Sequence, residues 1–178
     1  MIYLFLANGF EECEALAPLD ILRRANIEVQ TVGIGSNTIV GAHGISINCD
    51  TINKDLSFEN LKGIILPGGM PGTLNLEADK TVQSTIDFCY ENNLLISAIC
   101  AAPQILGHKD ILNGKNATCF PGFENQLKGA NFKNEKVVCD GNIITACGAG
   151  AAFDFGFKIL EYFTDKTTAN NMKETMRF

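Results

Sequence analysis

The fold is decided by a ten-residue segment, Leu94-Leu95-Ile96-Ser97-Ala98-Ile99-Cys100-Ala101-Ala102-Pro103. Apolar residues occupy nearly every position before Cys100 instead of alternating with polar ones, which is typical of a strand covered on both faces. A cysteine, two alanines and a proline follow, and proline suits the first turn of a helix. The segment therefore predicts a buried strand of a parallel sheet that leads directly into a helix.

The same alternation of strand and helix extends along the rest of the chain. Strands are expected at 2–7, 28–34, 63–66, 94–99, 116–119, 137–139 and 143–145. Helices are expected at 15–25, 80–92, 151–163 and 167–176, the first on condition that Pro18 lies in its first turn. With 178 residues and no linker, the chain is expected to form one domain, 1–178, of class α/β. Its sheet should be doubly wound and mainly parallel, with helices on both faces.

Three stretches interrupt this alternation. Asp140-Gly141-Asn142 stands between two apolar runs and is a strong signal for a hairpin turn. Residues 38–49 hold branched apolar residues around Gly41 and Gly44, which predicts a small antiparallel excursion. Residues 121–134 have no regular pattern and are expected to form a loop.

The composition argues against several classes of protein. The net charge is −6 and the pI about 4.9, and without a clustered basic stretch the chain is not expected to bind nucleic acid. The opening apolar run ends at Asn8-Gly9, too short for a signal sequence or a membrane span, so we expect a cytoplasmic protein with no membrane partner. Seven cysteines without a CxxC pair do not predict a disulfide framework, and two histidines in unrelated contexts do not predict a metal site.

Cys100 is placed where a doubly wound sheet binds ligands, at the carboxyl ends of its strands. It stands between a strand and a helix, as in a nucleophile elbow, where a reactive side chain is held on a tight turn. The helix N-terminus should favour a thiolate and lower the pKa of Cys100. A buried, inert cysteine that simply ends a strand is an equally good interpretation.

Two other groups could assist Cys100. The N–H groups of Gly68-Gly69 could form an anion nest and stabilise an oxyanion, although a plain turn explains the glycines equally well. Glu14, at the start of the first helix, could exchange a proton with a nearby thiol, or could serve only the helix dipole. His43 and His108 are weak candidates, because the first lies in the expected hairpin and the second near the end of a helix.

Together these motifs resemble the ThiJ/PfpI superfamily, and most of all its Parkinsonism-associated deglycase branch. The resemblance runs in order through Asn8-Gly9-Phe10-Glu11-Glu12-Cys13-Glu14, 18–25, Leu66-Pro67-Gly68-Gly69, Ala98-Ile99-Cys100-Ala101-Ala102-Pro103 and 148–155. It covers nearly the whole chain and implies a flavodoxin-like fold, a homodimer to which the first helix and the hairpin region contribute, and activity without an added cofactor.

The resemblance also implies the roles of individual residues. Cys100 matches the nucleophile, Glu14 its hydrogen-bonded partner, and the backbone N–H groups of Gly69 and Ala101 the oxyanion donors. The pocket residues are Gly68, Phe120 and Gly148.

Three positions depart from patterns seen in relatives. The protease-like branch carries a histidine directly after the nucleophile, and Ala101 in that position argues against a peptidase. Phe120 stands where relatives often carry a histidine, which leaves the role of base to Glu14 or water. Ala102 replaces a glycine that is common in the branch, and its methyl group can narrow the pocket without abolishing the elbow.

Three functions remain open at this level. An enzyme would act on a small reactive aldehyde or a modified protein, as a glyoxalase or deglycase does. A sensor of oxidative stress would carry Cys100 to a sulfinic acid without turning over a small molecule. A chaperone or binding module would keep Cys100 buried and inert. Cys119 or Cys147 could approach Cys100 as a resolving thiol, and the sequence alone does not place them.

Overall fold

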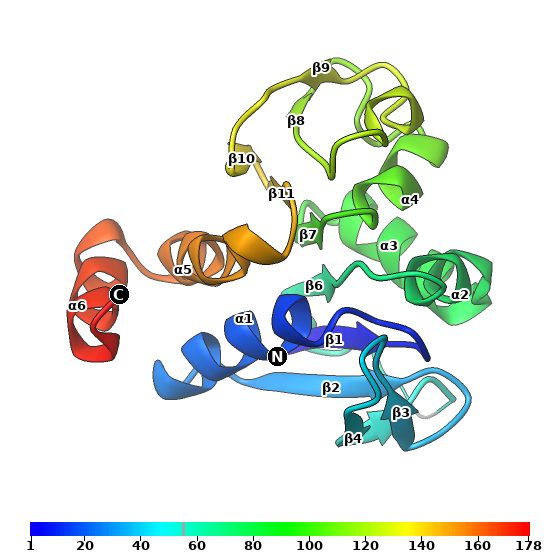
Figure 1. The fold of residues 1–178 in the computed structure, drawn as a ribbon, viewed down its shortest axis with the longest axis horizontal. Coiled ribbons are helices and arrows are strands. Elements are labelled where there is room, and N and C mark those ends of the chain that lie inside the picture. The colour runs from blue at the N-terminus through cyan, green and yellow to red at the C-terminus, as the bar shows by residue number, and fades with distance from the viewer. Residues whose placement is uncertain (55) are drawn as a thin grey trace.

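A seven-stranded sheet forms the centre of the molecule (Figure 1). The structure is a computed structural model, and it describes residues 1–54 and 56–178. The strand order is β10-β11-β7-β6-β1-β2-β5. These strands are β1 (Ile2–Leu6), β2 (Val29–Gly33), β5 (Thr51–Ile52), β6 (Gly63–Leu66), β7 (Leu95–Ile99), β10 (Val137–Asp140) and β11 (Ile143–Ala146). All neighbouring pairs in this sheet are parallel except β10 with β11. The expected mainly parallel, doubly wound sheet is therefore confirmed.

Helices cover both faces of the sheet. They are α1 (Glu12–Arg24), α2 (Gly72–Ala78), α3 (Lys80–Glu91), α4 (Pro103–His108), α5 (Ala152–Phe163) and α6 (Lys166–Met176). Successive side chains of a strand point to opposite faces. Leu4 and Leu6 of β1 accordingly lie in the core formed with α1, α5 and α6, while Tyr3 and Phe5 lie in the core formed with α2, α3 and α4. None of the helices in the described residues is long and apolar enough to cross a membrane.

Burial on both faces explains why the strand sequences are apolar throughout. Every residue of β1 and of β7 is buried. Each fully buried large apolar side chain contributes about 1.5–3 kcal/mol relative to an exposed one. The continuous run in 94–99 therefore indicated the correct layer structure, and β7 lies between β6 and β11 near the middle of the sheet.

The first helix begins earlier than expected. It starts at Glu12, not near residue 15, so Pro18 lies inside the helix instead of in its first turn. The expectation for Pro18 was wrong, because tertiary packing outweighs the lost backbone hydrogen bond. Pro18 is buried against α5 at Gly156, where any added side chain would meet Pro18 and Ile21.

Two expectations for the region after α4 need correction. The strand expected at 116–119 is only the two-residue β8 (Asn116–Ala117), and it lies outside the main sheet. The loop expected at 121–134 contains a 3-10 turn, η1 (Glu124–Gln126), and β9 (Asn131–Phe132), which pairs with β8 in parallel. Such short pairs depend on contacts distant in sequence, so no local pattern marks them.

The remaining elements agree with the sequence to within a few residues, apart from α2 and the edge strand β5, which had no clear signal. The expected hairpin at 38–49 is present as antiparallel β3 (Thr38–Val40) and β4 (Ser46–Asn48). The turn after Asp140 joins β10 to β11, and Gly141 there adopts a φ of 64°. A final 3-10 turn, η2 (Ala149–Ala151), leads from β11 into α5.

Candidate active site

Cys100 lies one residue beyond β7 in a left-handed backbone conformation, with a φ of 65°. This conformation costs about 1–3 kcal/mol for a residue other than glycine and is held only when the surroundings require it. Two hydrogen bonds hold it here. The Cys100 N–H donates to the Ala146 carbonyl at 2.9 Å, and its carbonyl accepts from the Phe120 N–H at 2.8 Å. The expected elbow is therefore present, with its cysteine partly exposed.

Glu14 reaches the same point from the first turn of α1. Its side chain is buried, with only 1% of the residue exposed, and one carboxyl oxygen accepts a hydrogen bond from the Gly68 N–H at 2.9 Å. The carboxyl group is also hydrogen bonded to the Cys100 thiol. Strand β1 and the turn after it thus bring residue 14 against residue 100, although the two lie far apart in sequence.

Gly68 is packed too tightly between these two side chains to carry one of its own. A Cβ atom at this position would lie 2.7 Å from the Cys100 Cβ and 2.7 Å from the Glu14 Oε2. Both distances are shorter than real Cβ contacts. Glycine at position 68 therefore allows the acid and the thiol to contact each other. The Gly68-Gly69 pair thus has a role in the site and is not only a turn.

Burial controls the ionisation of both groups. Burial raises the pKa of Glu14 from 4.5 to about 7, against the hydrogen bonds from Cys100 and Gly68, which lower it. The pKa of the Cys100 thiol is raised to about 12, first by burial and second by the Glu14 carboxylate. The expectation of a lowered Cys100 pKa was wrong, because burial, together with the Glu14 carboxylate that faces the sulfur, outweighs the backbone donors.

Those donors are nevertheless where the resemblance placed them. Hydrogen bonds from the backbone N–H groups of Ala101 and Gly69 act on the Cys100 sulfur and lower its pKa, against the larger effect of burial. Gly69 has a φ of 88°, and a side chain there would collide with the backbone of Glu11. Glycine at position 69 thus lets the backbone turn its N–H toward the cysteine.

Phe120 and Gly148 flank the elbow on the side of β11. A Cβ atom on Gly148 would lie 3.1 Å from the Phe120 ring. The Phe120 ring is 46% exposed and supplies an apolar wall with no group that could accept a proton. Sequence reasoning did not identify Ala146, whose carbonyl holds the elbow, because a backbone contact leaves no signal in residue type.

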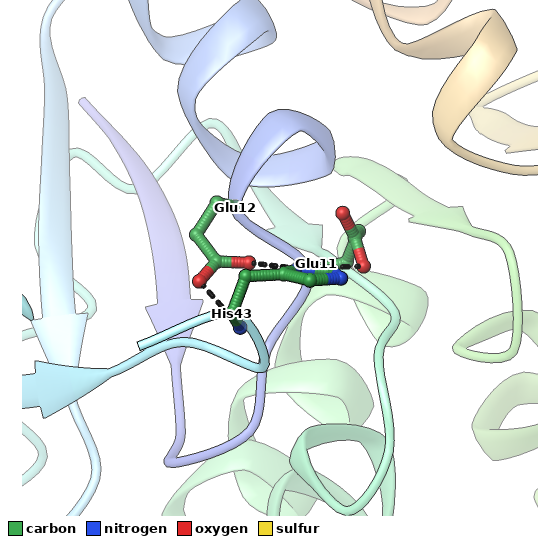
Figure 2. A group of neighbouring side chains, drawn as sticks. All are labelled: Glu11, Glu12 and His43. Carbon is green, nitrogen blue, oxygen red and sulfur yellow. Dashed lines mark hydrogen bonds and ion pairs between the residues drawn. The ribbon is translucent and has the colours of Figure 1, made fainter. Parts of the chain in front are cut away.

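A second polar group lies beside the elbow, where the hairpin meets α1 (Figure 2). His43 Nδ1 lies 2.9 Å from Glu12 Oε2, and the His43 backbone N–H donates to Glu12 Oε1 at 2.8 Å. Ligand atoms of Glu11, Glu12 and His43 all lie within 4.8 Å of one another, as a divalent cation would require. The polar atoms already satisfy one another, so we interpret the group as an ion pair that ties the hairpin to α1.

His108 lies away from the elbow, as the sequence indicated. It is the last residue of α4, with Nδ1 2.5 Å from a Glu77 carboxylate oxygen and Nε2 2.8 Å from the Gln126 side chain. Neither ring nitrogen is directed at Cys100, so the acid that faces the thiol is Glu14.

Comparisons with known proteins agree with this geometry. A model of the DJ-1/PfpI family matches residues 1–162. The chain is 34% identical over 164 residues to Protein dj-1beta of Drosophila melanogaster, which covers 90% of this chain and 88% of that protein. It is 31% identical over 173 residues to the Parkinson disease protein 7 homolog of Danio rerio, covering 94% and 92% of the two chains.

Solved structures extend the similarity to the fold. Oxidized DJ-1 of Toxoplasma gondii is similar with a TM-score of 0.95 at 26% identity, covering 99% of this chain and 97% of that one. The crystal structure of Drosophila melanogaster DJ-1beta is similar with a TM-score of 0.93 at 30% identity, covering 98% and 96%. The expected flavodoxin-like fold is confirmed by these neighbours.

Proposed function

This chain belongs to the DJ-1/PfpI family, and from that premise we propose that it is an enzyme that acts on reactive aldehydes through Cys100. One observation carries the proposal. A strained cysteine at the end of β7 faces a buried carboxyl group and two backbone N–H donors. That set supplies a nucleophile, a proton acceptor and an oxyanion site, which are the three requirements for attack on a carbonyl.

In the first step, the Cys100 sulfur attacks the aldehyde carbon of methylglyoxal. Glu14, with a pKa of about 7, takes the thiol proton as the carbon–sulfur bond forms, and the product is a hemithioacetal. The developing negative charge on the aldehyde oxygen is stabilised by the N–H groups of Gly69 and Ala101. No cofactor takes part in this step.

In the second step, Glu14 transfers a proton between the two carbon atoms of the adduct. The hydrogen on the former aldehyde carbon leaves as a proton and one returns to the neighbouring carbon, which converts the hemithioacetal to a thioester of the hydroxy acid. Water then cleaves the thioester, releasing lactate and restoring the thiol. One methylglyoxal and one water thus give one lactate, with no external oxidant or reductant. An adduct of methylglyoxal on a modified protein would enter through the same attack.

The test is turnover of methylglyoxal by the Cys100→Ser variant. We expect lactate formation to fall at least ~10³-fold, because the covalent adduct depends on this sulfur. Cys139→Ser is the matched control, because Cys139 is an exposed cysteine on β10 and should leave turnover unchanged. Equal rates for the parent and Cys100→Ser would rule out the proposal.

A second candidate function is sensing of oxidants by Cys100. Below pH about 7 the Glu14 carboxyl is protonated and can donate a hydrogen bond to an oxygen on the sulfur, which favours a stable sulfinate. The similar Toxoplasma gondii DJ-1 structure is described as oxidized. Intact-mass analysis after mild peroxide should then show a preferential gain of two oxygens at Cys100. An even distribution over the seven cysteines would reject sensing by this residue.

We also propose that the protein forms a homodimer in the cytoplasm. The hairpin between β3 and β4 exposes Val40 and Ile45, which are 42% and 52% exposed, and it lies beside the start of α1. Apolar side chains there would be covered by a second copy. Light scattering on the eluting protein tests this, and Ile45→Lys should shift the mass toward the monomer.

A further inference from the structure

Cys119 and Cys147 line the same cavity, next to the elbow but separate from it. The cavity has a volume of about 550 Å³ and its wall also includes Phe132 and Lys136. Cys119 is buried at 2% exposure and Cys147 is partly exposed. The proposed aldehyde chemistry uses neither residue.

Contacts before and after the two cysteines place them on neighbouring segments. The Thr118 N–H donates to the Thr145 hydroxyl at 2.9 Å, which places the segment after β8 directly beside β11. Further along, two residues after Thr118 and three after Thr145, a Cβ atom on Gly148 would lie 3.1 Å from the Phe120 ring. Cys119 and Cys147 lie between these two contacts on their respective segments. The two cysteines therefore lie on neighbouring segments and line one cavity, and a disulfide between them would need their Cα atoms to come within about 7 Å.

The two sulfurs differ in accessibility, so an oxidant would reach Cys147 before Cys119. The pKa of the Cys119 thiol is raised to about 12, first by burial and then by the negative charges of Glu124 and of a Cys147 thiolate. Cys119 is therefore a protected thiol. Cys147 is more accessible, and its backbone N–H donates to the carbonyl of Lys136, whose side chain lines the same cavity.

We propose that Cys119 and Cys147 form a redox-active dithiol that closes to a disulfide when the protein meets a hydroperoxide. The Cys147 thiolate attacks one peroxide oxygen, the O–O bond breaks, and Cys147 becomes a sulfenic acid as water leaves. The Cys119 sulfur then attacks the Cys147 sulfur, and the sulfenic oxygen leaves as a second water with the Cys119 proton. Two thiols are oxidised, and one hydrogen peroxide is reduced to two waters.

The disulfide would act on the wall of the candidate active site. Phe120, next to Cys119, donates its N–H to the Cys100 carbonyl, and Ala146, next to Cys147, accepts the Cys100 N–H. The disulfide would then link covalently the two segments whose residues Phe120 and Ala146 hold Cys100 by hydrogen bonds. Closing the link should therefore change the reactivity of Cys100 toward iodoacetamide even though Cys100 is not in the disulfide.

The test is peptide mapping of the folded protein after treatment with hydrogen peroxide, blocking of remaining thiols with iodoacetamide, and digestion without reductant. We expect a peptide pair joined through Cys119 and Cys147 within one chain, lighter than the two thiol peptides by two hydrogens. A parent protein in which both cysteines are alkylated after peroxide, or in which Cys147 is linked to Cys100, would overturn the proposal.

Variants separate this pair from the proposed aldehyde chemistry. Cys100→Ser should still form the link, so a failure of the proposed function leaves this test intact. Cys139→Ser, at an exposed cysteine outside the cavity, should form it to the same extent as the parent. Cys147→Ser should abolish it and leave Cys119 unlinked. If Cys147→Ser does not fold, the map of the parent still decides the outcome.

Discussion

Two neighbouring strands of the sheet each end in a cysteine, and the two cysteines have different surroundings. β7 and β11 are parallel and in register, with Ile99 opposite Ala146, and the next residues are Cys100 and Cys147. Cys100 turns into a left-handed conformation and faces a buried acid. Cys147 continues toward η2 and lines a cavity whose wall also includes Cys119.

The comparison teaches that a strand end delivers a cysteine to the ligand-binding edge, but its chemistry depends on what other elements place opposite it. Glu14 arrives on α1 and can take and return a proton at neutral pH. Cys119 arrives on the segment after β8 and offers only a sulfur. The first arrangement suits carbonyl chemistry, and the second suits reversible oxidation.

The largest expected effect comes from removing the acid at the elbow. Glu14→Gln keeps the shape of the side chain but cannot take the thiol proton, so methylglyoxal turnover should fall about 10²–10⁴-fold. In the parent, turnover should rise with pH through about 7 as Glu14 ionises, and this rise should be absent in the variant. Steady-state rates across pH measure both.

Glu11→Gln is the control for that experiment. The negative charge of Glu11 raises the pKa of Glu14, so its removal should move the midpoint of the pH profile downward while activity is kept. Unchanged turnover in Glu14→Gln would show that Cys100 needs no acid. The proposed difference between Cys100 and Cys147 would then be wrong.

The pH dependence of stability should show the same buried carboxyl. The folded protein holds the Glu14 proton more tightly than the unfolded chain, with a pKa of about 7 against 4.5. The stabilisation from this proton is therefore complete below pH about 4.5 and is lost as the pH rises to about 7. Over that range the free energy of unfolding should fall by about 3 kcal/mol. Urea unfolding of the parent and Glu14→Gln across this window gives the difference, and parallel curves would contradict the buried carboxyl.

A pair of glycine substitutions tests how tightly the acid and thiol are packed. Gly68→Ala would put a methyl group 2.7 Å from both Cys100 and Glu14, so we expect a loss of about 1–3 kcal/mol in stability together with loss of turnover. Gly150→Ala is the control, because nothing lies within 4 Å of its Cβ position and the effect should stay within about 0.5 kcal/mol. Equal losses of stability in the two variants would show that the space between Cys100 and Glu14 can accept a methyl group.

The smallest expected effect is on alkylation of the cysteines. The Glu14 carboxylate raises the pKa of Cys100, so Glu14→Gln should lower that pKa and speed alkylation of Cys100 by iodoacetamide at neutral pH about tenfold. Alkylation of Cys147 should not change. Slower alkylation of Cys100 in the variant would instead place the proton on Glu14 and the thiolate on Cys100 in the parent.

Local pattern was enough for most of the strands in the main sheet and for most helices. The run 94–99 is apolar because both of its faces are covered, so its residue types alone indicate that it is buried. The extent of α1 was not predictable in this way, because Pro18 is accommodated only by its packing against Gly156 of α5. The small β8–β9 pair likewise joins segments that have no signal of their own.

The sequence by itself determined the layered α/β fold and the position of Cys100 after a buried strand, since both depend on hydrophobic pattern and on turn residues. Only the tertiary structure decided how Cys100 ionises, because burial of the thiol, together with the charge of Glu14, outweighs the local backbone donors. It also decided that Cys119 and Cys147 line the same cavity, because the position of a short segment beside β11 is set by contacts far apart in the chain.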